Sequence, residues 1–163
     1  MKVKIFSFES CFRYVFWNMY DSKSKFALIS IQSPDKNDGV LFTKTDNCKD
    51  VLTLYFEDVV EEDIYGMENL IIFNNSHADE ILRFINDNTE VDYFIIHCHA
   101  GVSRSSAIGK FILEYFNEDS KWIDESKIKD EVNGNVINKY YPNQLVYKTL
   151  KLQEKNNGKW LNK

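Results

Sequence analysis

The sequence predicts a single α/β domain with a mostly parallel central sheet of four to five strands and helices on both sides. Apolar runs of strand length alternate along the chain with segments of helical periodicity. The last of these runs lacks polar alternation, as in a strand that is covered on both faces. A chain of 163 residues, 44% of them hydrophobic, fits one compact domain with a substantial core.

The N-terminal segment predicts a strand followed by a helix. Residues 2–8 have the composition of a strand, and apolar residues then recur at helical spacing after Ser10, which we expect to cap the helix. The segment starts basic and apolar, as a signal peptide does. Glu9 and Arg13 interrupt that apolar run, and no small-residue cleavage site follows. We therefore expect this segment to be part of the fold.

Two further strands are expected before the middle of the chain, and two segments fit more than one structure. Residues 26–31 are apolar and end at the turn-forming run 33–39, and residues 51–56 alternate in the manner of a third strand. Residues 69–73 fit either a short extra strand or part of a loop. Residues 119–138 fit a short helix and a loop that contains an Asn-Gly pair.

The second half predicts one buried strand, residues 92–97, and three helices around it. Ser76 and Asp79 indicate a capping box for the first helix. The second begins near Arg104, and the third begins at Pro142, because proline is favoured at the first helical position. The residues expected on the buried faces of these helices are Ala78, Ile81, Leu82, Ile85, Ile108, Phe111, Ile112, Tyr115, Leu145, Val146, Thr149 and Leu150.

Charge and cysteine content narrow the class of protein. The formal net charge of −5 argues against nucleic-acid binding, which depends on clustered cations. No apolar run is long enough to span a membrane. The three cysteines, Cys11, Cys48 and Cys98, are odd in number and lack metal-ligand spacing, so free thiols in a reducing cytoplasm are expected. We expect a monomer that uses no metal and no cofactor.

The segment IIHCHAGVSRSS, residues 95–106, carries the candidate chemistry. It lies between a buried strand and a helix, where successive backbone N–H groups and the positive end of the helix dipole can hold an anion. The thiolate of Cys98 is a nucleophile. Five residues separate it from Arg104, whose planar fork can hold two phosphoryl oxygens. Gly101 lets the backbone approach the anion, and Ser105 can donate to the sulfur.

The HCHAGVSRS segment resembles the HC-x5-R-[ST] signature of protein tyrosine and dual-specificity phosphatases. The chain as a whole is similar to the compact members of that family found in bacteria and phages, with a LISI strand before the middle and PNQLVYKTL (142–150) in the closing helix. The resemblance implies a cysteinyl-phosphate intermediate, no metal, and hydrolysis by water. It also implies a phosphatase domain, which we expect over 1–155, and we expect residues 156–163 to form a frayed C-terminal tail.

The same resemblance assigns the substrate-binding positions and the substrate. Phosphate contacts are expected from the loop residues His99, Ala100, Gly101, Val102, Ser103, Arg104 and Ser105. The loop has no lysine, which counts against a highly charged lipid head group. We expect a phosphorylated protein or peptide as the partner, with phosphotyrosine favoured over phosphoserine and phosphothreonine.

A general acid must protonate the leaving group, and the family uses an aspartate on a loop upstream of the cysteine. Asp58 fits best because it follows the strand predicted at 51–56. It lies forty residues before Cys98, farther than in the family pattern, so an insertion is required, for which residues 64–73 are the candidate. Asp63 fits the spacing better but lies away from the strand end, and it remains the alternative.

Other functions and roles stay open at the level of sequence. A phosphatase-like module that binds phosphate without turnover would share the fold, although such relatives usually lack the cysteine or the arginine, and Cys98 and Arg104 are both present. An RNA 5′-phosphatase of the same superfamily would also fit, but the acidic balance counts against it. Cys11 or Cys48 could form a reversible disulfide with Cys98, although ordinary half-buried thiols are the simpler interpretation.

Overall fold

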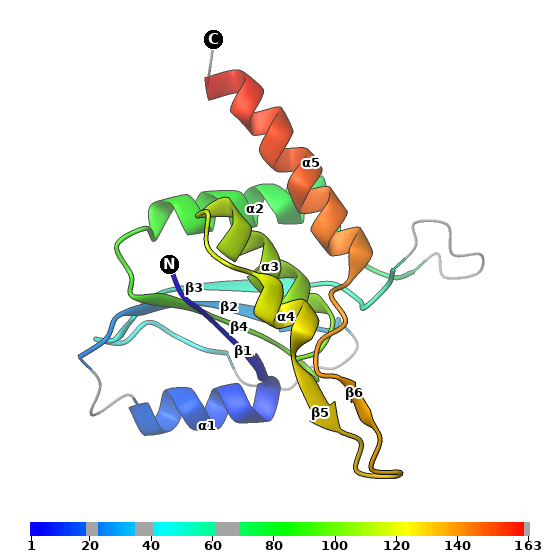
Figure 1. Cartoon of the computed structure of the whole chain (residues 1–163). Coiled ribbons are helices and arrows are strands. Elements are labelled where there is room, and N and C mark those ends of the chain that lie inside the picture. Colours follow the sequence, from blue (N-terminus) through cyan, green and yellow to red (C-terminus); the bar gives the residue numbers. More distant parts are fainter. Residues whose placement is uncertain (19–22, 35–40, 61–68, 162–163) are drawn as a thin grey trace.

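A computed structural model describes residues 1–18, 23–34, 41–60 and 69–161 (Figure 1). The elements follow one another as β1 (Val3–Ser7), α1 (Phe8–Asn18), β2 (Phe26–Gln32), β3 (Cys48–Tyr55), α2 (Asn75–Asp87), β4 (Tyr93–Cys98), α3 (Arg104–Tyr115), α4 (Lys121–Glu125), β5 (Lys127–Lys129), β6 (Val136–Asn138) and α5 (Gln144–Leu161). Among the described residues, no helix is long and apolar enough to cross a membrane.

The central sheet has four strands in the order β1-β4-β2-β3, and every neighbouring pair is parallel. This confirms the predicted α/β class and the parallel sheet. In register, Ser7 of β1 lies beside Cys98 of β4, and Ser30 of β2 lies beside His97. The carboxyl ends of the three strands therefore meet at one edge, where parallel sheets commonly place their ligand sites.

Helices cover both faces of the sheet. Helix α1 lies against one face, and α2, α3 and α5 lie against the other (Figure 1). Successive β4 side chains alternate between the two cores: Phe94 and Ile96 join the larger cluster under α2, α3 and α5, whereas Tyr93 and Ile95 join the smaller cluster with α1. All six residues of β4 are buried. Two cores on two faces explain the missing polar alternation in this strand.

Helix α1 begins earlier than expected, directly after β1. The Ser7 hydroxyl oxygen accepts the backbone N–H of Ser10 at 3.2 Å. Ser10 therefore lies inside the first turn, and the prediction that it caps the helix is wrong. Ser7, the last residue of β1, is the N-cap instead, because its hydroxyl accepts an N–H group of the first helical turn.

Helix α2 does have a capping box, but it is formed by different residues. The Asn74 side chain accepts the N–H groups of Ser76 and His77 at 2.9 and 3.3 Å. The backbone N–H of Asn74 donates in return to Nδ1 of His77 at 3.2 Å. The predicted box of Ser76 and Asp79 is therefore wrong by two residues, because an asparagine at the N-cap takes the role that the sequence pattern gave to a serine.

Helix α5 begins at Gln144, after the predicted start at Pro142. The side-chain oxygen of Asn143 accepts the N–H of Val146 at 3.1 Å, which makes Asn143 the N-cap. The helix then continues without a break to Leu161, so residues 156–161 extend it. The expected buried faces of α2, α3 and α5 are confirmed at ten of twelve positions, and the other two, Tyr115 and Thr149, are half-buried.

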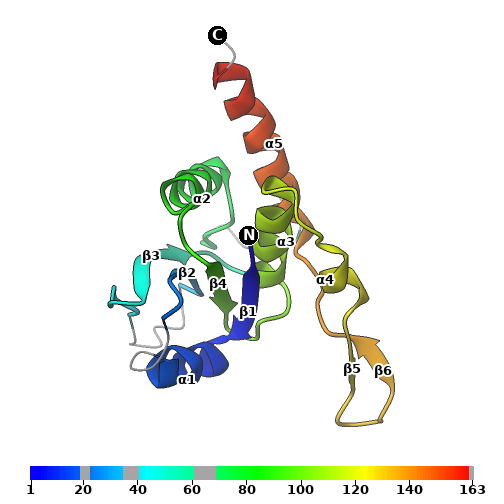
Figure 2. The ribbon, with the colours of Figure 1, turned by 60° about the vertical axis from the view of Figure 1, so that its left-hand side comes forward.

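The ambiguous segment 119–138 forms α4 and a two-stranded antiparallel hairpin of β5 and β6, whose strands were not predicted. Figure 2 shows the hairpin projecting from the body of the domain. Residues 69–73 contain no strand. They are attached to the end of β3 through the N–H of Glu57, which donates to the backbone oxygen of Ile71 at 2.8 Å.

Candidate active site

The loop between β4 and α3 lies at the carboxyl edge of the sheet. Cys98 is the last residue of β4, and Arg104 is the first residue of α3. The N–H of Phe8, at the start of α1, donates to the backbone oxygen of His99 at 3.1 Å and fixes the loop against β1. The loop borders a cleft of about 410 Å³ lined by Ser33, Glu57, Asp58, Cys98, His99, Ala100, Val102, Ser103 and Arg104.

The sulfur of Cys98 has two polar neighbours, one in the loop and one in the first turn of α3. The N–H of Gly101 donates to Sγ at 3.2 Å. The hydroxyl oxygen of Ser105 lies 3.2 Å from the same sulfur. Both groups can donate a hydrogen bond to a negatively charged sulfur, and the N-terminus of α3 adds the positive end of its dipole.

Gly101 has the backbone conformation that this arrangement requires. Its φ is +72°, in the left-handed region. A Cβ at this position would lie 2.5 Å from the carbonyl carbon of Phe6 and 2.5 Å from the backbone nitrogen of Ser7. The loop packs directly on the backbone of β1, so only glycine fits where the chain turns to bring its N–H to the sulfur.

Two nitrogens of the Arg104 guanidinium differ in their hydrogen bonds to the described residues. Its Nη1 donates to the hydroxyl of Ser33 at 3.0 Å and to the backbone oxygen of Phe56 at 2.8 Å. Its Nε is buried and has no hydrogen-bond acceptor among the described residues. The side chain is only 5% exposed. A buried guanidinium N–H without an acceptor is costly, and an anion in the cleft would satisfy it.

Of the two candidate acids, Asp58 and Asp63, the structure describes only Asp58. The Oδ1 of Asp58 accepts the Ser103 hydroxyl at 2.7 Å and Nδ2 of Asn143 at 2.8 Å. Asp58 lines the same cleft as Cys98. Asp63 lies outside the described residues. Asp58 thus lines the cleft of Cys98 from the segment that follows β3.

His97 lies beneath the loop, inside the sheet. Its ring is fully buried, and Nε2 lies 2.8 Å from the hydroxyl oxygen of Ser30 on β2. Nδ1 is 3.4 Å from the backbone oxygen of Cys98. The imidazole therefore links two neighbouring strands directly below the nucleophile.

The predicted substrate-binding residues fall into two groups. His99, Ala100, Val102, Ser103 and Arg104 line the cleft. Gly101 and Ser105 are buried and contact the sulfur of Cys98.

Sequence reasoning missed three contributors to the site. They are the Ser33 hydroxyl and the Phe56 carbonyl, which hold Arg104, and the Asn143 amide, which binds Asp58. Ser33 and Phe56 each follow a parallel strand, so the rule that ligand sites lie at carboxyl ends of strands could have indicated them. Asn143 lies in the PNQLVYKTL segment that the resemblance had placed in the closing helix, but its contact with Asp58 was not predicted.

The other two thiols do not reach this site. Cys11 and Cys48 both pack in the cluster on the α1 side of the sheet. Cys48 is in register with Phe26, which is in register with Tyr93 at the far end of β4. Cys98 is at the near end of that strand and packs in the opposite cluster. A disulfide between Cys98 and Cys48 would need a rearrangement of the sheet.

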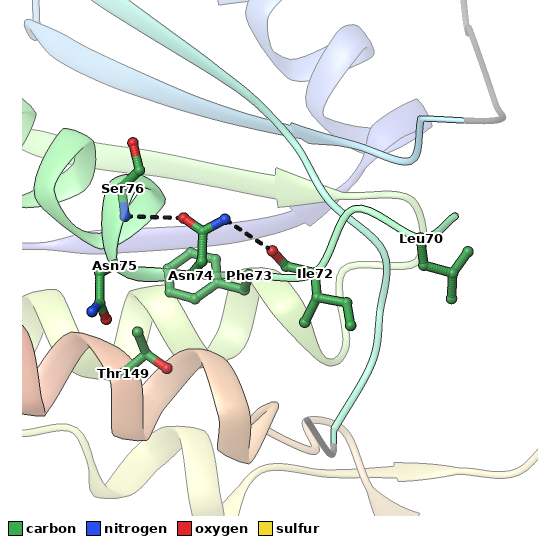
Figure 3. Close-up of a pocket in the computed structure, with 7 residues that line it drawn as sticks. All are labelled: Leu70, Ile72, Phe73, Asn74, Asn75, Ser76 and Thr149. Carbon is green, nitrogen blue, oxygen red and sulfur yellow. Dashed lines mark hydrogen bonds between the residues drawn. The ribbon is translucent and has the colours of Figure 1, made fainter. Parts of the chain in front are cut away.

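A larger groove of about 620 Å³ lies where the start of α2 meets α5. Figure 3 shows its lining residues, with Asn74 joined to the N–H of Ser76 and the oxygen of Ile72. None of the seven lining residues is charged or carries a thiol. Of these two depressions, the smaller cleft is the one lined by a thiol, a guanidinium and carboxylates. In the described part of the chain, no three histidine, cysteine or carboxylate side chains cluster as metal ligands do.

No known family model matches the sequence, and no curated protein matches it significantly. Among solved structures, the human tyrosine phosphatase-like serine/threonine/tyrosine-interacting protein matches with a TM-score of 0.57 and 15% identity, over 94% of this chain and 91% of that chain. Tk-PTP in its active form matches with a TM-score of 0.51 and 17% identity, over 94% and 90%. At these identities the likeness shows a shared fold, that of tyrosine phosphatase-like proteins.

Proposed function

We propose that this protein is a cysteine-dependent phosphatase that hydrolyses phosphate monoesters, with phosphotyrosine in proteins as its preferred substrate. One observation carries the proposal: the Cys98 sulfur and the Nε of Arg104, which has no acceptor among the described residues, belong to one loop that borders one cleft. A thiolate that attacks phosphorus supplies the nucleophile, and a guanidinium that binds the equatorial oxygens supplies a clamp.

In the first step, the Cys98 thiolate attacks phosphorus and the bond between phosphorus and the ester oxygen breaks. Asp58, in its protonated form, gives a proton to the departing oxygen, so that an alcohol or a phenol leaves. Arg104 and the loop N–H groups bind the charge that is spread over the phosphoryl oxygens in the transition state. The product is a cysteinyl phosphate.

In the second step, a water molecule attacks the phosphorus of the cysteinyl phosphate. The Asp58 carboxylate takes a proton from this water, and the bond between sulfur and phosphorus breaks. Inorganic phosphate leaves and Cys98 returns as a thiolate. Ser105, whose hydroxyl oxygen lies 3.2 Å from the sulfur, donates a hydrogen bond to the leaving thiolate.

The charges around the cleft support a substrate with a single phosphate. Arg104 is the only arginine or lysine among the described lining residues, and Glu57 and Asp58 are carboxylates. Additional phosphates on an inositol ring or a triphosphate would meet these carboxylates without a matching cation. A phosphorylated side chain of a protein brings one phosphate and an uncharged leaving group, which suits this distribution.

The test is turnover of para-nitrophenyl phosphate in the presence of a metal chelator. We expect Cys98→Ser to lose activity by at least about a thousandfold and Arg104→Lys by roughly a hundredfold, because lysine cannot make the two-pronged contact. Cys48→Ala removes a thiol from the opposite face of the sheet and serves as the control with near-normal turnover. Wild-type turnover in Cys98→Ser, or phosphate binding without any turnover in the wild type, would overturn the proposal.

A further inference from the structure

We propose that Asn143 is a positioning residue for the general acid, holding one carboxyl oxygen of Asp58 against the anion-binding loop so that the other oxygen carries the transferred proton. The inference rests on the proposed function and adds a residue to it. Asn143 lies at the start of α5, which packs on the α2 and α3 side of the sheet (Figure 1). It is eighty-five residues from Asp58 in sequence.

The Asn143 side chain uses both ends of its amide. It is 1% exposed. Nδ2 donates to Oδ1 of Asp58 at 2.8 Å and to the backbone oxygen of Val59 at 3.0 Å. Its side-chain oxygen accepts the N–H of Val146 at 3.1 Å. Two donor contacts thus fix the acid-bearing segment, and the acceptor contact fixes the amide to the helix.

The backbone of Asn143 completes the link to the anion-binding loop. Its N–H donates to the backbone oxygen of Ser103 at 3.2 Å. The Ser103 hydroxyl donates to Oδ1 of Asp58 at 2.7 Å. Asn143, Ser103 and Asp58 therefore form a closed ring of hydrogen bonds between three segments that are distant in sequence. A mutually bonded ring restrains each of its members more than a single contact does.

The two donors meet the same atom of the carboxyl group. Both Ser103 and Asn143 donate to Oδ1, and no donor among the described residues contacts Oδ2 of Asp58. In a protonated carboxyl group one oxygen accepts and the other carries the hydrogen. With Oδ1 occupied as an acceptor, the proton resides on Oδ2, and the acid has one orientation in the cleft.

This restraint matters because Asp58 is exposed and lies past the end of a strand. A side chain in that setting would otherwise sample several rotamers, and proton transfer requires the acid within hydrogen-bond reach of the ester oxygen. If the carboxyl group is fixed before the substrate arrives, the first step no longer includes the entropy loss of ordering this side chain.

The experiment uses Asn143→Asp, which keeps the acceptor for Val146 and removes both donor contacts. The matched control is Asn157→Asp on the same helix, where Nδ2 donates to Oδ1 of another aspartate, Asp79, at 3.3 Å. We measure kcat/KM for phenyl phosphate, whose leaving group needs a proton, and for 2,4-dinitrophenyl phosphate, whose leaving group does not. Thermal melting of each variant reports whether it folds.

We expect Asn143→Asp to lose at least about tenfold on phenyl phosphate and less than about threefold on 2,4-dinitrophenyl phosphate, because only the protonated departure is impaired. Asn157→Asp should leave both values near wild type. Introduced into Asp58→Asn, Asn143→Asp should cause no further loss, since it acts through the acid. Ser103→Ala, which removes the other donor to Oδ1, should show the same selective loss if Asn143→Asp does not fold.

Equal losses on the two substrates, or a full further loss in the Asp58→Asn background, would overturn the role of Asn143 and leave the phosphatase proposal standing. A wild-type protein that hydrolyses neither ester would instead overturn the proposed function, and the inference with it. Wild-type turnover in Asp58→Asn would reject Asp58 as the acid while Cys98 and Arg104 remain in their roles.

Discussion

Cys98 and Cys48 are buried to nearly the same degree, at 2% and 1% exposure, yet their sulfur atoms have opposite surroundings. Cys98 receives the N–H of Gly101 and borders a cleft. Cys48 donates its own S–H to the backbone oxygen of Asp50 at 3.5 Å and packs among apolar side chains with Cys11. The Cys98 sulfur thus faces hydrogen-bond donors, which can stabilise a thiolate, whereas the Cys48 sulfur faces an acceptor, which requires the protonated thiol.

The difference shows that burial alone does not make a cysteine inert or reactive. Burial raises the pKa of Cys48 to about 11, and the neighbouring Asp50 carboxylate adds to the rise. Burial raises the pKa of Cys11 further, with Cys48 as a second cause. We expect the reactivity of each cysteine to depend on which polar groups face its sulfur, and at Cys98 those groups come from the loop after β4 and the first turn of α3.

Alkylation by iodoacetate tests this contrast most directly and has the largest expected effect. At pH 7 we expect Cys98 to be modified at least about a hundredfold faster than Cys11 or Cys48, because its sulfur borders an open cleft, whereas burial raises the pKa of the other two thiols. The carboxylate of the reagent should also be drawn to Arg104. Peptide mass spectrometry over a time course measures the three rates separately.

Inorganic phosphate provides the control for the alkylation experiment, since it should occupy the cleft and slow the reaction at Cys98 alone. Modification of Cys48 at a rate comparable to that of Cys98 would contradict the comparison. Modification of Cys98 that is insensitive to phosphate would contradict the assignment of Arg104 as an anion clamp.

A pair of glycines offers a second test, since one of them brings the N–H to the sulfur. Gly101 and Gly134 share a φ of +72°. A Cβ on Gly101 would meet the backbone of β1 at 2.5 Å, whereas a Cβ on Gly134 would meet nothing within 4 Å. Gly134→Ala should cost only about 1 kcal/mol of folding free energy, from backbone strain alone.

Gly101→Ala should cost several times more stability and lower kcat/KM by roughly a hundredfold, because the loop must shift away from β1 and take the N–H group with it. Urea unfolding and turnover of para-nitrophenyl phosphate measure the two effects. If both alanine variants behaved alike, the close packing of the loop on β1 would not be what presents the N–H to Cys98.

The central strands, the order of helices around them and the position of the loop could be predicted from sequence. Their signals are local, since 92–97 is a mostly apolar run without polar alternation and Cys98 and Arg104 lie in one short segment. The helix starts were less accurate. Several adjacent polar residues can each cap a helix, and packing decides among them, as at Asn74 and Asn143.

The remainder of the site depends on contacts that no local pattern records. Ser33 and the Phe56 carbonyl reach Arg104 from other strands, and Asn143 reaches Asp58 across most of the chain. A single sequence does not reveal which distant polar groups meet once the sheet is assembled. The β5–β6 hairpin was missed for a different reason, since its strands have only three residues each, β5 is exposed, β6 is partly exposed, and both carry little apolar periodicity.

The smallest expected effect concerns Cys48 and is measured as folding stability at alkaline pH. The pKa of Cys48 in the folded protein, about 11, lies above its ordinary value of 9.0. The folded state therefore holds the proton more tightly than the unfolded chain does. This contribution is fully present below pH 9 and is lost as the pH rises from 9 to 11. A shift of this size corresponds to about 3 kcal/mol in full, of which roughly 2 kcal/mol is lost by pH 11.

Urea unfolding of the wild type and of Cys48→Ala at intervals between pH 8 and pH 11 measures the contribution of the Cys48 thiol to stability. Burial also raises the pKa values of Tyr93, Tyr147 and Cys11, so both proteins should lose stability in this range. Burial, the largest cause of these three shifts, acts in both proteins and largely cancels in the difference. The effect of the Cys48 thiolate on Cys11 and Tyr93 disappears in the variant and counts as part of the Cys48 contribution. The wild type should therefore decline more steeply than Cys48→Ala, and the two should converge by about 2 kcal/mol. Parallel curves would mean that the Cys48 thiolate is tolerated in the fold, and the contrast with Cys98 would then rest on the cleft alone.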